Sequence, residues 1–145
     1  MDPATIALLV RMWIAEAGWA REVDHAAQGH IMLRAAEKSD LQTAVHNMVD
    51  RFSFANTKHP WLLEIDSSCR APVLYPGTWP LEKCQVLVDR AIALLQGRLA
   101  DPCHGKAQQW RARKSKALRR ALRKGYIRVG CGRTNNAYLK EPTWP

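Results

Sequence analysis

The sequence has no long apolar run, no internal repeat and no low-complexity tract. A membrane-spanning helix needs about 20 predominantly apolar residues, and no stretch of this chain approaches that length. The amino-terminal segment is also a poor signal peptide, because Asp2 stands where basic residues are usual and because Arg11 and Glu16 interrupt the apolar part. We therefore expect a protein made in the cytoplasm, without a signal peptide or a transmembrane segment.

Acidic residues are missing from the long segment 102–140, which is rich in lysine and arginine. The whole chain has a formal net charge of +9 and a pI near 9.8. A positive charge of this size indicates an anionic partner, whether nucleic acid, an acidic membrane or an acidic cell wall. Charge alone does not choose among the three.

Cysteine pairs with metal-binding spacing are missing as well. None of Cys69, Cys84, Cys103 and Cys131 belongs to a CxxC pair, and the adjacent Cys103-His104 has poor geometry for a shared metal ion. We expect no metal site and no cofactor. Free, partly buried thiols are the default expectation. In an oxidising compartment disulfides such as Cys69 with Cys84 could form, and four cysteines allow three pairings.

What is present is the composition of a globular domain. Of the 145 residues, 47% are hydrophobic and 24% are charged. A chain of this length can bury a core without the help of metals or disulfides. We expect one domain over residues 1–145, and a monomer.

The first helix is predicted from the start signal Asp2-Pro3 and from apolar residues that recur at spacings of three and four. These apolar residues are Ile6, Leu9, Val10, Trp13, Ile14 and Ala17. Glu16 falls at the border of this stripe, so we expect its side chain to be half-buried among large apolar neighbours. Loss of water disfavours the charged form of a carboxyl group, as a general acid requires. The alternative is a surface glutamate whose carboxylate stays in water.

Two further helices are predicted before a long irregular segment. Asp24 can cap a helix that runs to about Lys38, and another helix covers Asp40 to Asp50. From Phe52 to Pro80 the periodicity disappears, and a loop of this length is usually functional or wraps around a site. Its aromatic side chains could stack on sugar rings or fill a secondary core. The residues assigned to substrate binding are Trp61, Tyr75, Trp79 and, further along the chain, Trp110.

The last third is predicted as a helix, a basic helix and a hairpin. Thr78 and Pro80 start a helix with a buried apolar stripe, which Gly97 ends. Trp110 begins the narrow apolar face of an amphipathic helix whose outer surface is very basic. Gly125 could cap this helix. The residues assigned to docking on a polyanion are Arg113, Lys116, Arg119, Arg120, Arg123 and Lys124. Short alternating segments at 126–129 and 137–139 predict a small terminal hairpin.

Several segments match one known family in the same order along the chain. Ala15-Glu16-Ala17 corresponds to an AEA sequence in the opening helix, and 26–33 stands where that family has a helix ending in a VVLNR-like run. The segment 84–102, which ends in Asp101-Pro102, is similar to a segment of the form A-x-x-A-L-x-G … D-P-T-G-G-A. The tail 127–140 is similar to a closing I-G-x-H-x-F hairpin. With these segments the chain resembles the SleB-type cell-wall hydrolases over nearly its whole length.

The resemblance implies a mainly helical, lysozyme-like α+β fold with a small carboxyl-terminal hairpin, and it implies that Glu16 is the catalytic glutamate. The chain also departs from the pattern. Arg34-Ala35 stands where the family usually has Asn-Arg, and Cys103-His104-Gly105 replaces the T-G-G turn. Glu16 is therefore the one residue whose role we carry over from the family.

The implied activity is cleavage of the β-1,4 bond between N-acetylmuramic acid and N-acetylglucosamine. Glu16 would protonate the bridging oxygen, and ordinary glycosidases need a second carboxylate. Glu64 and Asp66 are the only acids of the long loop. The transglycosylase route needs no second acid, because the C6 hydroxyl of the muramic acid attacks C1. We therefore predict a lytic transglycosylase that acts on peptidoglycan glycan strands after phage-type release or delivery to the cell envelope.

The basic segment leaves other functions open. It would hold an enzyme near anionic envelope polymers or a membrane surface, and this attraction should weaken with salt. It could instead belong to a nucleic-acid-binding module, although no recognised motif for specific nucleic-acid binding is present. A catalytically inactive relative that only binds glycan is the third alternative. Substitution of Glu16 separates the enzyme from the nucleic-acid-binding module, since it should abolish lysis and leave DNA affinity almost unchanged.

Overall fold

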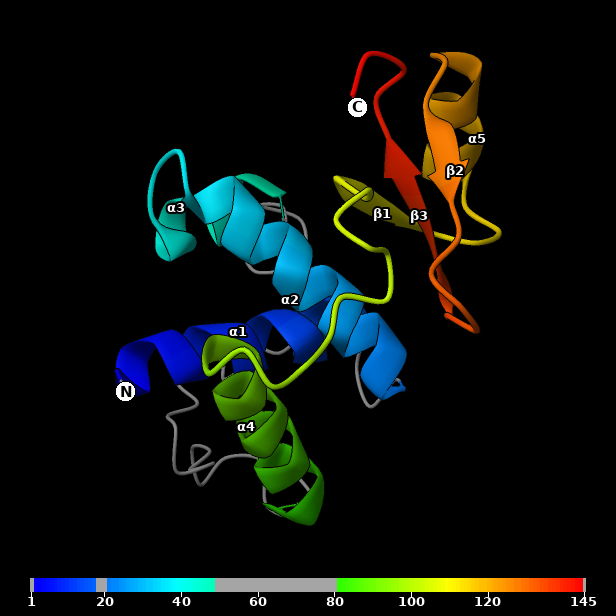
Figure 1. The fold of residues 1–145 in the computed structure, drawn as a ribbon. Helices are drawn as coiled ribbons and strands as arrows, with labels where there is room; N and C mark the ends of the chain where they lie inside the picture. The colour runs from blue at the N-terminus through cyan, green and yellow to red at the C-terminus, as the bar shows by residue number, and fades with distance from the viewer. Residues whose placement is uncertain (1, 18–20, 49–80, 145) are drawn as a thin grey trace.

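The computed structural model describes residues 2–17, 21–48 and 81–144, which form five helices and three strands (Figure 1). In chain order these are α1 Pro3–Ala17, α2 Glu22–Ala36, α3 Leu41–Met48, α4 Leu81–Leu95, β1 Gln109–Ala112, α5 Lys116–Arg123, β2 Ile127–Val129 and β3 Asn136–Lys140. The strands form one antiparallel sheet. The predicted α+β class is confirmed. None of the described helices has the length and apolar character that crossing a membrane requires.

The starts of α1 and α3 and the end of α4 lie at residues that favour helix termini. Asp2 accepts hydrogen bonds from the Ala4 N–H (3.0 Å) and the Thr5 hydroxyl (2.9 Å), and Asp40 does the same for Thr43. Gly97 ends α4 with a positive φ of 73°. There the Arg98 N–H donates to the Ala93 carbonyl at 2.8 Å, which is the hydrogen bond of a Schellman cap.

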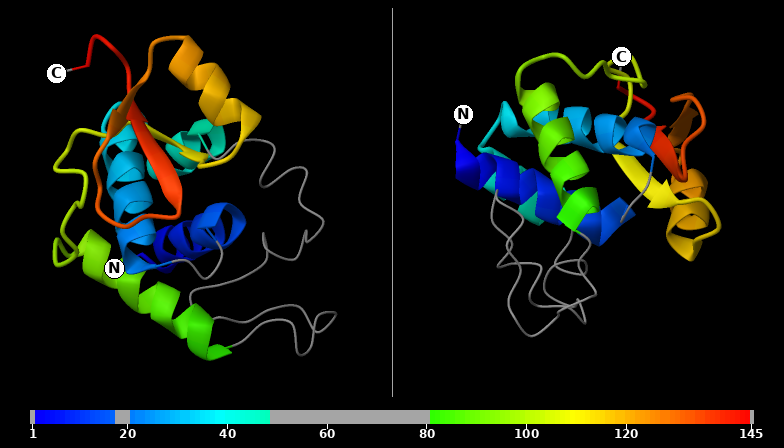
Figure 2. Two further views of the ribbon diagram at one scale, coloured as in Figure 1. Left: turned by 90° about the vertical axis from the view of Figure 1, so that its right-hand side faces the viewer. Right: turned by 90° about the horizontal axis from the view of Figure 1, so that it is seen from below.

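Helices α1, α2 and α4 pack against one another and enclose the main core (Figures 1 and 2). The predicted apolar stripe of α1 supplies much of it, with Leu9, Val10 and Trp13 fully buried. Gly29 of α2 allows the close approach of α4, because a Cβ atom there would lie 2.5 Å from a methyl carbon of Leu94. The other core residues of these helices include Met12, Ala27, Ile31, Met32, Cys84, Leu87 and Ala91.

The three strands are ordered β1-β3-β2. Trp110 of β1 stands opposite Tyr138 of β3, and both side chains belong to the main core. The next residues along the strands face the other way, where Ala137 and Leu139 form a second, smaller core with Leu118 and Ala121 of α5. Figure 2 shows the consequence: α5 covers one face of the sheet and the helical part covers the other.

The predicted terminal hairpin is confirmed by β2 and β3, but the predicted extent of the basic helix is wrong. Trp110 does not belong to a helix. It lies in β1, whose backbone groups pair with β3, and the helix starts only at Lys116. Ser115 caps α5 by accepting the Leu118 N–H at 3.0 Å. Gly125, with φ of 94°, ends the helix as expected.

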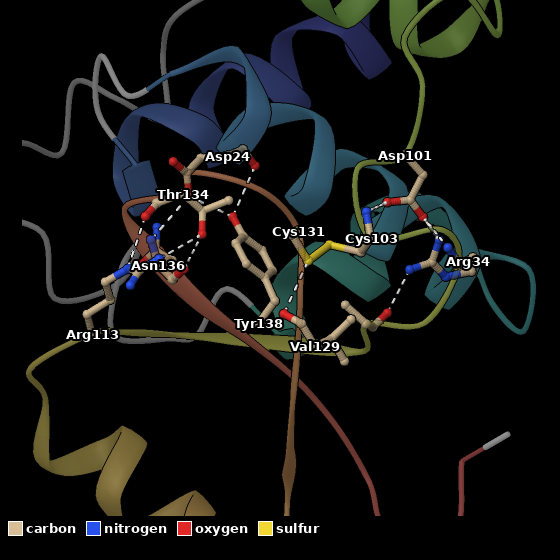
Figure 3. The surroundings of a disulfide bond; sticks show 12 residues. Asp24, Arg34, Asp101, Cys103, Arg113, Val129, Cys131, Thr134, Asn136 and Tyr138 are labelled. Atoms are coloured by element: carbon tan, nitrogen blue, oxygen red, sulfur yellow. Dashed lines mark hydrogen bonds and ion pairs between the residues drawn. A yellow bond between two sulfur atoms is a disulfide. The ribbon is translucent and has the colours of Figure 1, made fainter.

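The expectation of free thiols is also wrong. Cys103 and Cys131 form a disulfide, and Cys84 is disulfide-bonded as well. The Cys103–Cys131 bond joins the connection between α4 and β1 to the turn between β2 and β3 (Figure 3). It therefore ties the sheet to the segment that follows the helical part.

Candidate functional site

Glu16 lies in the last turn of α1, where its side chain is half-buried as expected from its position at the edge of the apolar stripe. The indole Nε1–H of Trp110 donates a hydrogen bond to Glu16 Oε2 at 3.2 Å. These two residues are 94 positions apart in the sequence. The contact joins the end of the first helix to the first strand of the sheet, so the position of the carboxyl group depends on how the two parts of the molecule pack.

Trp110 is held firmly. Its side chain is only 6% exposed, and its backbone is paired with β3 opposite the buried Tyr138. An indole N–H can donate a hydrogen bond but cannot accept one. Glu16 Oε2 is therefore the acceptor in this contact. The hydrogen bond orients the carboxyl group against the buried indole.

This arrangement assigns Trp110 a different place from the predicted one. A side chain with 6% exposure offers no open ring face on which a sugar could stack. Its contribution to the site is the hydrogen bond to Glu16. The other predicted substrate residues, Trp61, Tyr75 and Trp79, lie outside the described residues, as do Glu64 and Asp66.

Asp24 forms a second buried polar centre, which the sequence did not suggest (Figure 3). The carboxylate is fully buried and accepts hydrogen bonds from the backbone N–H groups of Asn135 (2.8 Å) and Asn136 (3.2 Å). The Tyr138 hydroxyl donates to the same carboxylate at 2.9 Å. Asp24 thus joins the start of α2 to the turn before β3. Its predicted role as a helix cap is wrong, since Arg21 occupies the cap position of α2.

Tyr138 stays protonated in this environment. Burial raises the pKa of its hydroxyl above the usual value, and the negative charge and hydrogen bond of Asp24 raise it further. The phenol therefore remains a hydrogen-bond donor over the physiological pH range. Asp24 and Tyr138 together hold β3 in place opposite Trp110. They therefore affect Glu16 indirectly, through the position of Trp110.

His25 is buried beside this centre and stacks obliquely on Trp13, with ring centroids 5.1 Å apart. Its Nδ1 atom lies 2.7 Å from Arg90 Nη1. A guanidinium group only donates hydrogen bonds, so Nδ1 is the acceptor in this contact. Arg90 also approaches Glu22 at 3.7 Å. These contacts connect α2 to α4 and make His25 a structural residue.

The connection 98–108 is organised by Asp101 and Arg34 (Figure 3). Asp101 accepts the backbone N–H groups of Cys103 and Gly105, both at 2.9 Å, and pairs with Arg34 at 2.6 Å. Arg34 also donates to the Ala107 carbonyl at 2.6 Å. Burial by itself raises the pKa of Asp101, but the two N–H groups and Arg34 outweigh it and hold that pKa below its usual value.

The predicted docking residues fall into two groups. Arg113 donates to the Thr134 carbonyl at 3.0 Å and so braces the turn before β3. The others are exposed on or just after α5. They are Lys116, Arg119, Arg120, Arg123 and Lys124. Within the described ranges none of these five forms an ion pair with an acidic side chain, because residues 102–140 contain no acids and no other described carboxylate reaches them.

Metal-binding chemistry has no support in the described part of the chain, where no group of three or more histidine, cysteine, aspartate or glutamate side chains could hold an ion. Comparisons with protein-family models, with curated proteins and with solved structures found no match to this chain. The chemistry of the residues themselves therefore carries the functional argument.

Proposed function

We propose that this protein cleaves the glycan strands of peptidoglycan, with Glu16 as the general acid and base of a lytic transglycosylase. The observation that carries the proposal is the hydrogen bond from Trp110 to Glu16. It supports a half-buried carboxyl group that a buried indole N–H holds in position. The resemblance of the Ala15-Glu16-Ala17 segment to the SleB-type hydrolases supports the same residue.

In the proposed reaction Glu16 donates its carboxyl proton to the glycosidic oxygen as the bond to C1 of the muramic acid breaks. The sugar passes through an oxocarbenium-like transition state. The Glu16 carboxylate then removes the proton of the C6 hydroxyl, whose oxygen attacks C1 and closes a 1,6-anhydro ring. The nucleophile belongs to the substrate, so it needs no second positioned reactant. The proton returns to Glu16, which is ready for another cycle.

A route with a single acid also suits four of the other carboxylates that the structure describes. Asp24 and Asp101 are occupied by internal hydrogen bonds, and Asp2 and Asp40 cap helices. None of these four has the free oxygen that a nucleophile requires. An α+β molecule with its acid at a helix end, next to a small sheet, is consistent with the lysozyme-like fold that we propose as the finer description.

The test is lysis of purified peptidoglycan by the wild type and by Glu16→Gln. Glutamine keeps the size of the side chain and still accepts a hydrogen bond from Trp110, but it cannot donate and recover a proton. We expect the lytic rate to fall by a factor of about 100 or more. Glu37→Gln is the matched control, because Glu37 is exposed just after α2 and should leave the rate unchanged. Equal rates for the wild type and Glu16→Gln would refute the proposal.

The second candidate function is binding of nucleic acid through the exposed basic residues of α5. Phosphate contacts would supply the affinity, which would fall steeply with salt. The same Glu16→Gln protein distinguishes the two functions. Unchanged DNA affinity together with an absence of lytic activity in the wild type would favour the binding module.

A further inference from the structure

A hollow with a volume of about 190 Å³ lies where α5 meets β1 and the start of β2. We call it the basic notch. It is lined by Arg111, Ala117, Arg120, Ala121, Lys124 and Tyr126. The notch is on the face of the sheet covered by α5, whereas Trp110 and Glu16 lie toward the helical part. It is therefore separate from the candidate catalytic group.

The positions of these residues explain the hollow. Residues 117, 120, 121 and 124 share one face of α5, because they are separated by three or four positions. The two alanines on that face are too small to fill the space beside the sheet. Arg120 and Lys124 project from the same helix face, and Arg111 enters from β1. Three positive groups therefore line one small concave site.

Arg111 is fixed in place before any ligand arrives. Its guanidinium donates to the Trp110 carbonyl at 2.7 Å and to Gln109 Oε1 at 2.9 Å. These contacts use two of its five N–H donors, which leaves others for a ligand. Neither Arg120 nor Lys124 forms an ion pair within the part of the chain that is described. Three cations without a counter-charge repel one another, and an anion in the notch would remove that repulsion.

Phosphate is the anion that fits best. Guanidinium groups match the geometry of phosphate oxygens with two parallel hydrogen bonds, and lysine adds a compact charge. Phosphate also presents more oxygen acceptors than a carboxylate to three donors that approach from different sides.

The surroundings of the notch indicate what carries the phosphate. Tyr126 packs partly against the small core under α5 and is the one aromatic side chain that lines the notch, whereas grooves for single-stranded nucleic acid stack successive bases on several aromatic rings. Among the described residues, the two large apolar side chains that are exposed are Val86 and Ile127, and both lie elsewhere. Val86 is on α4, and Ile127 alternates with Arg128 so that it shares the face of Val129 and Tyr138, away from α5. Within the part of the chain that the structure describes, no large exposed apolar side chain beside the notch could enter a lipid layer.

We propose that the basic notch binds a phosphate group of an anionic polymer without bases, such as a polyol-phosphate chain of a cell envelope. The exposed cations elsewhere on α5 give weaker, less specific attraction to neighbouring phosphates. This inference rests on the proposed function only in one respect, namely that the polymer belongs to a cell envelope. Phosphate binding itself can hold or fail whether or not Glu16 is catalytic.

The experiment measures binding of poly(glycerol phosphate) to the full chain by calorimetry, with Arg120→Gln/Lys124→Gln as the test variant. Arg119→Gln/Arg123→Gln is the matched control, since it removes the same charge from exposed positions of α5 that do not line the notch. We expect the test variant to lose a factor of about ten or more in affinity and the control to lose about threefold or less. Thermal unfolding of both variants verifies that they are folded.

A second measurement uses the wild type alone. Titration with inorganic phosphate should shift the NMR amide signals of 120–126 before those of other exposed basic segments. Equal loss of affinity in the two variants, or no localised shifts, would overturn the proposal in favour of diffuse attraction. Tighter binding of duplex DNA or of phosphatidylglycerol vesicles than of poly(glycerol phosphate), with the same dependence on Arg120 and Lys124, would overturn the choice of polymer.

Discussion

At the scale of single residues, the hydrogen bond between Glu16 and Trp110 makes the orientation of the proposed catalytic carboxyl group depend on the packing of a buried side chain. The carboxyl group comes from a helix end and the indole from a strand, and the hydrogen bond between them is 3.2 Å long. Because Trp110 is buried and paired opposite Tyr138, it cannot shift without disturbing the sheet. The orientation of Glu16 is therefore set by the fold.

Substitution Trp110→Phe tests this positioning role. Phenylalanine retains an aromatic ring in the core and removes the N–H donor. We expect kcat for peptidoglycan cleavage to fall by about tenfold, the value of one hydrogen bond to a charged or reacting group, with KM nearly unchanged. Steady-state kinetics on soluble glycan oligomers would measure both constants. Trp144→Phe, at a partly buried position near the carboxyl terminus, is the control. A fall in stability without any change in kcat would show that the indole has only a structural role.

The second prediction for a single residue concerns the contribution of Asp24 to stability. In Asp24→Asn an amide NH₂ would replace one acceptor oxygen and face donors from Asn135, Asn136 and Tyr138. We expect the free energy of unfolding to fall by about 2–4 kcal/mol. Urea denaturation would measure the loss. Asp40→Asn serves as the control, because asparagine caps a helix as well as aspartate does, and it should leave the urea midpoint almost unchanged.

At the scale of elements, the connection 98–108 is stabilised by charge and by a disulfide. The Asp101 carboxylate accepts hydrogen bonds from two backbone N–H groups and from Arg34. Cys103, two residues further on, is bonded to Cys131 in the turn between β2 and β3. This segment positions β1 and therefore Trp110.

The pH dependence of stability follows from Asp101. Its pKa is lower in the folded state than the ordinary value of 3.8, so the folded state binds its proton less readily than the unfolded state. The resulting stabilisation is present above pH 3.8 and is lost as the pH falls through the folded pKa. We expect Asp101→Asn to lose less stability than the wild type between about pH 5 and pH 3. Parallel urea titrations would detect the difference, and identical pH slopes would contradict it.

The disulfide gives the second prediction at this scale. It closes a loop whose ends are 28 residues apart. The double variant Cys103→Ser/Cys131→Ser should lose about 3–4 kcal/mol of stability, mainly because the unfolded chain regains freedom. Thermal unfolding would show a lower midpoint in the variant than in the oxidised wild type. A reductant should lower the midpoint of the wild type by breaking this bond, which the variant no longer has. Equal midpoints for the variant and the oxidised wild type would mean that the bond does not form.

Helices with a clear apolar period could be predicted from the sequence, and so could the terminal hairpin. The stripe of α1 and the glycine end of α4 are local signals. β1 was missed because the alternation of polar and apolar residues from Gln109 to Ala112 is only four residues long, too short to indicate a strand without its pairing with β3. The burial of Asp24 could not be predicted either, since its partners lie more than 100 positions away.

At the scale of the whole molecule, the small sheet separates two environments. Along β1, Trp110 points toward Glu16 and the main core, and the adjacent Arg111 points toward α5 and the basic notch. A strand of four residues thus contributes to both candidate sites. The position of Glu16 at the edge of the apolar stripe could be inferred from sequence, whereas the notch depends on the packing of α5 against the sheet.

The most direct test of the central claim is mass spectrometry of the soluble products released from purified peptidoglycan by the wild type and by Glu16→Gln. We expect 1,6-anhydromuropeptides from the wild type and none from Glu16→Gln, because only the intact glutamate can donate a proton to the bridging oxygen and then remove one from the C6 hydroxyl. Products with reducing ends would contradict the transglycosylase route and point to a second carboxylate. The absence of products from both proteins, at several pH values and at low salt, would contradict the enzymatic role of Glu16.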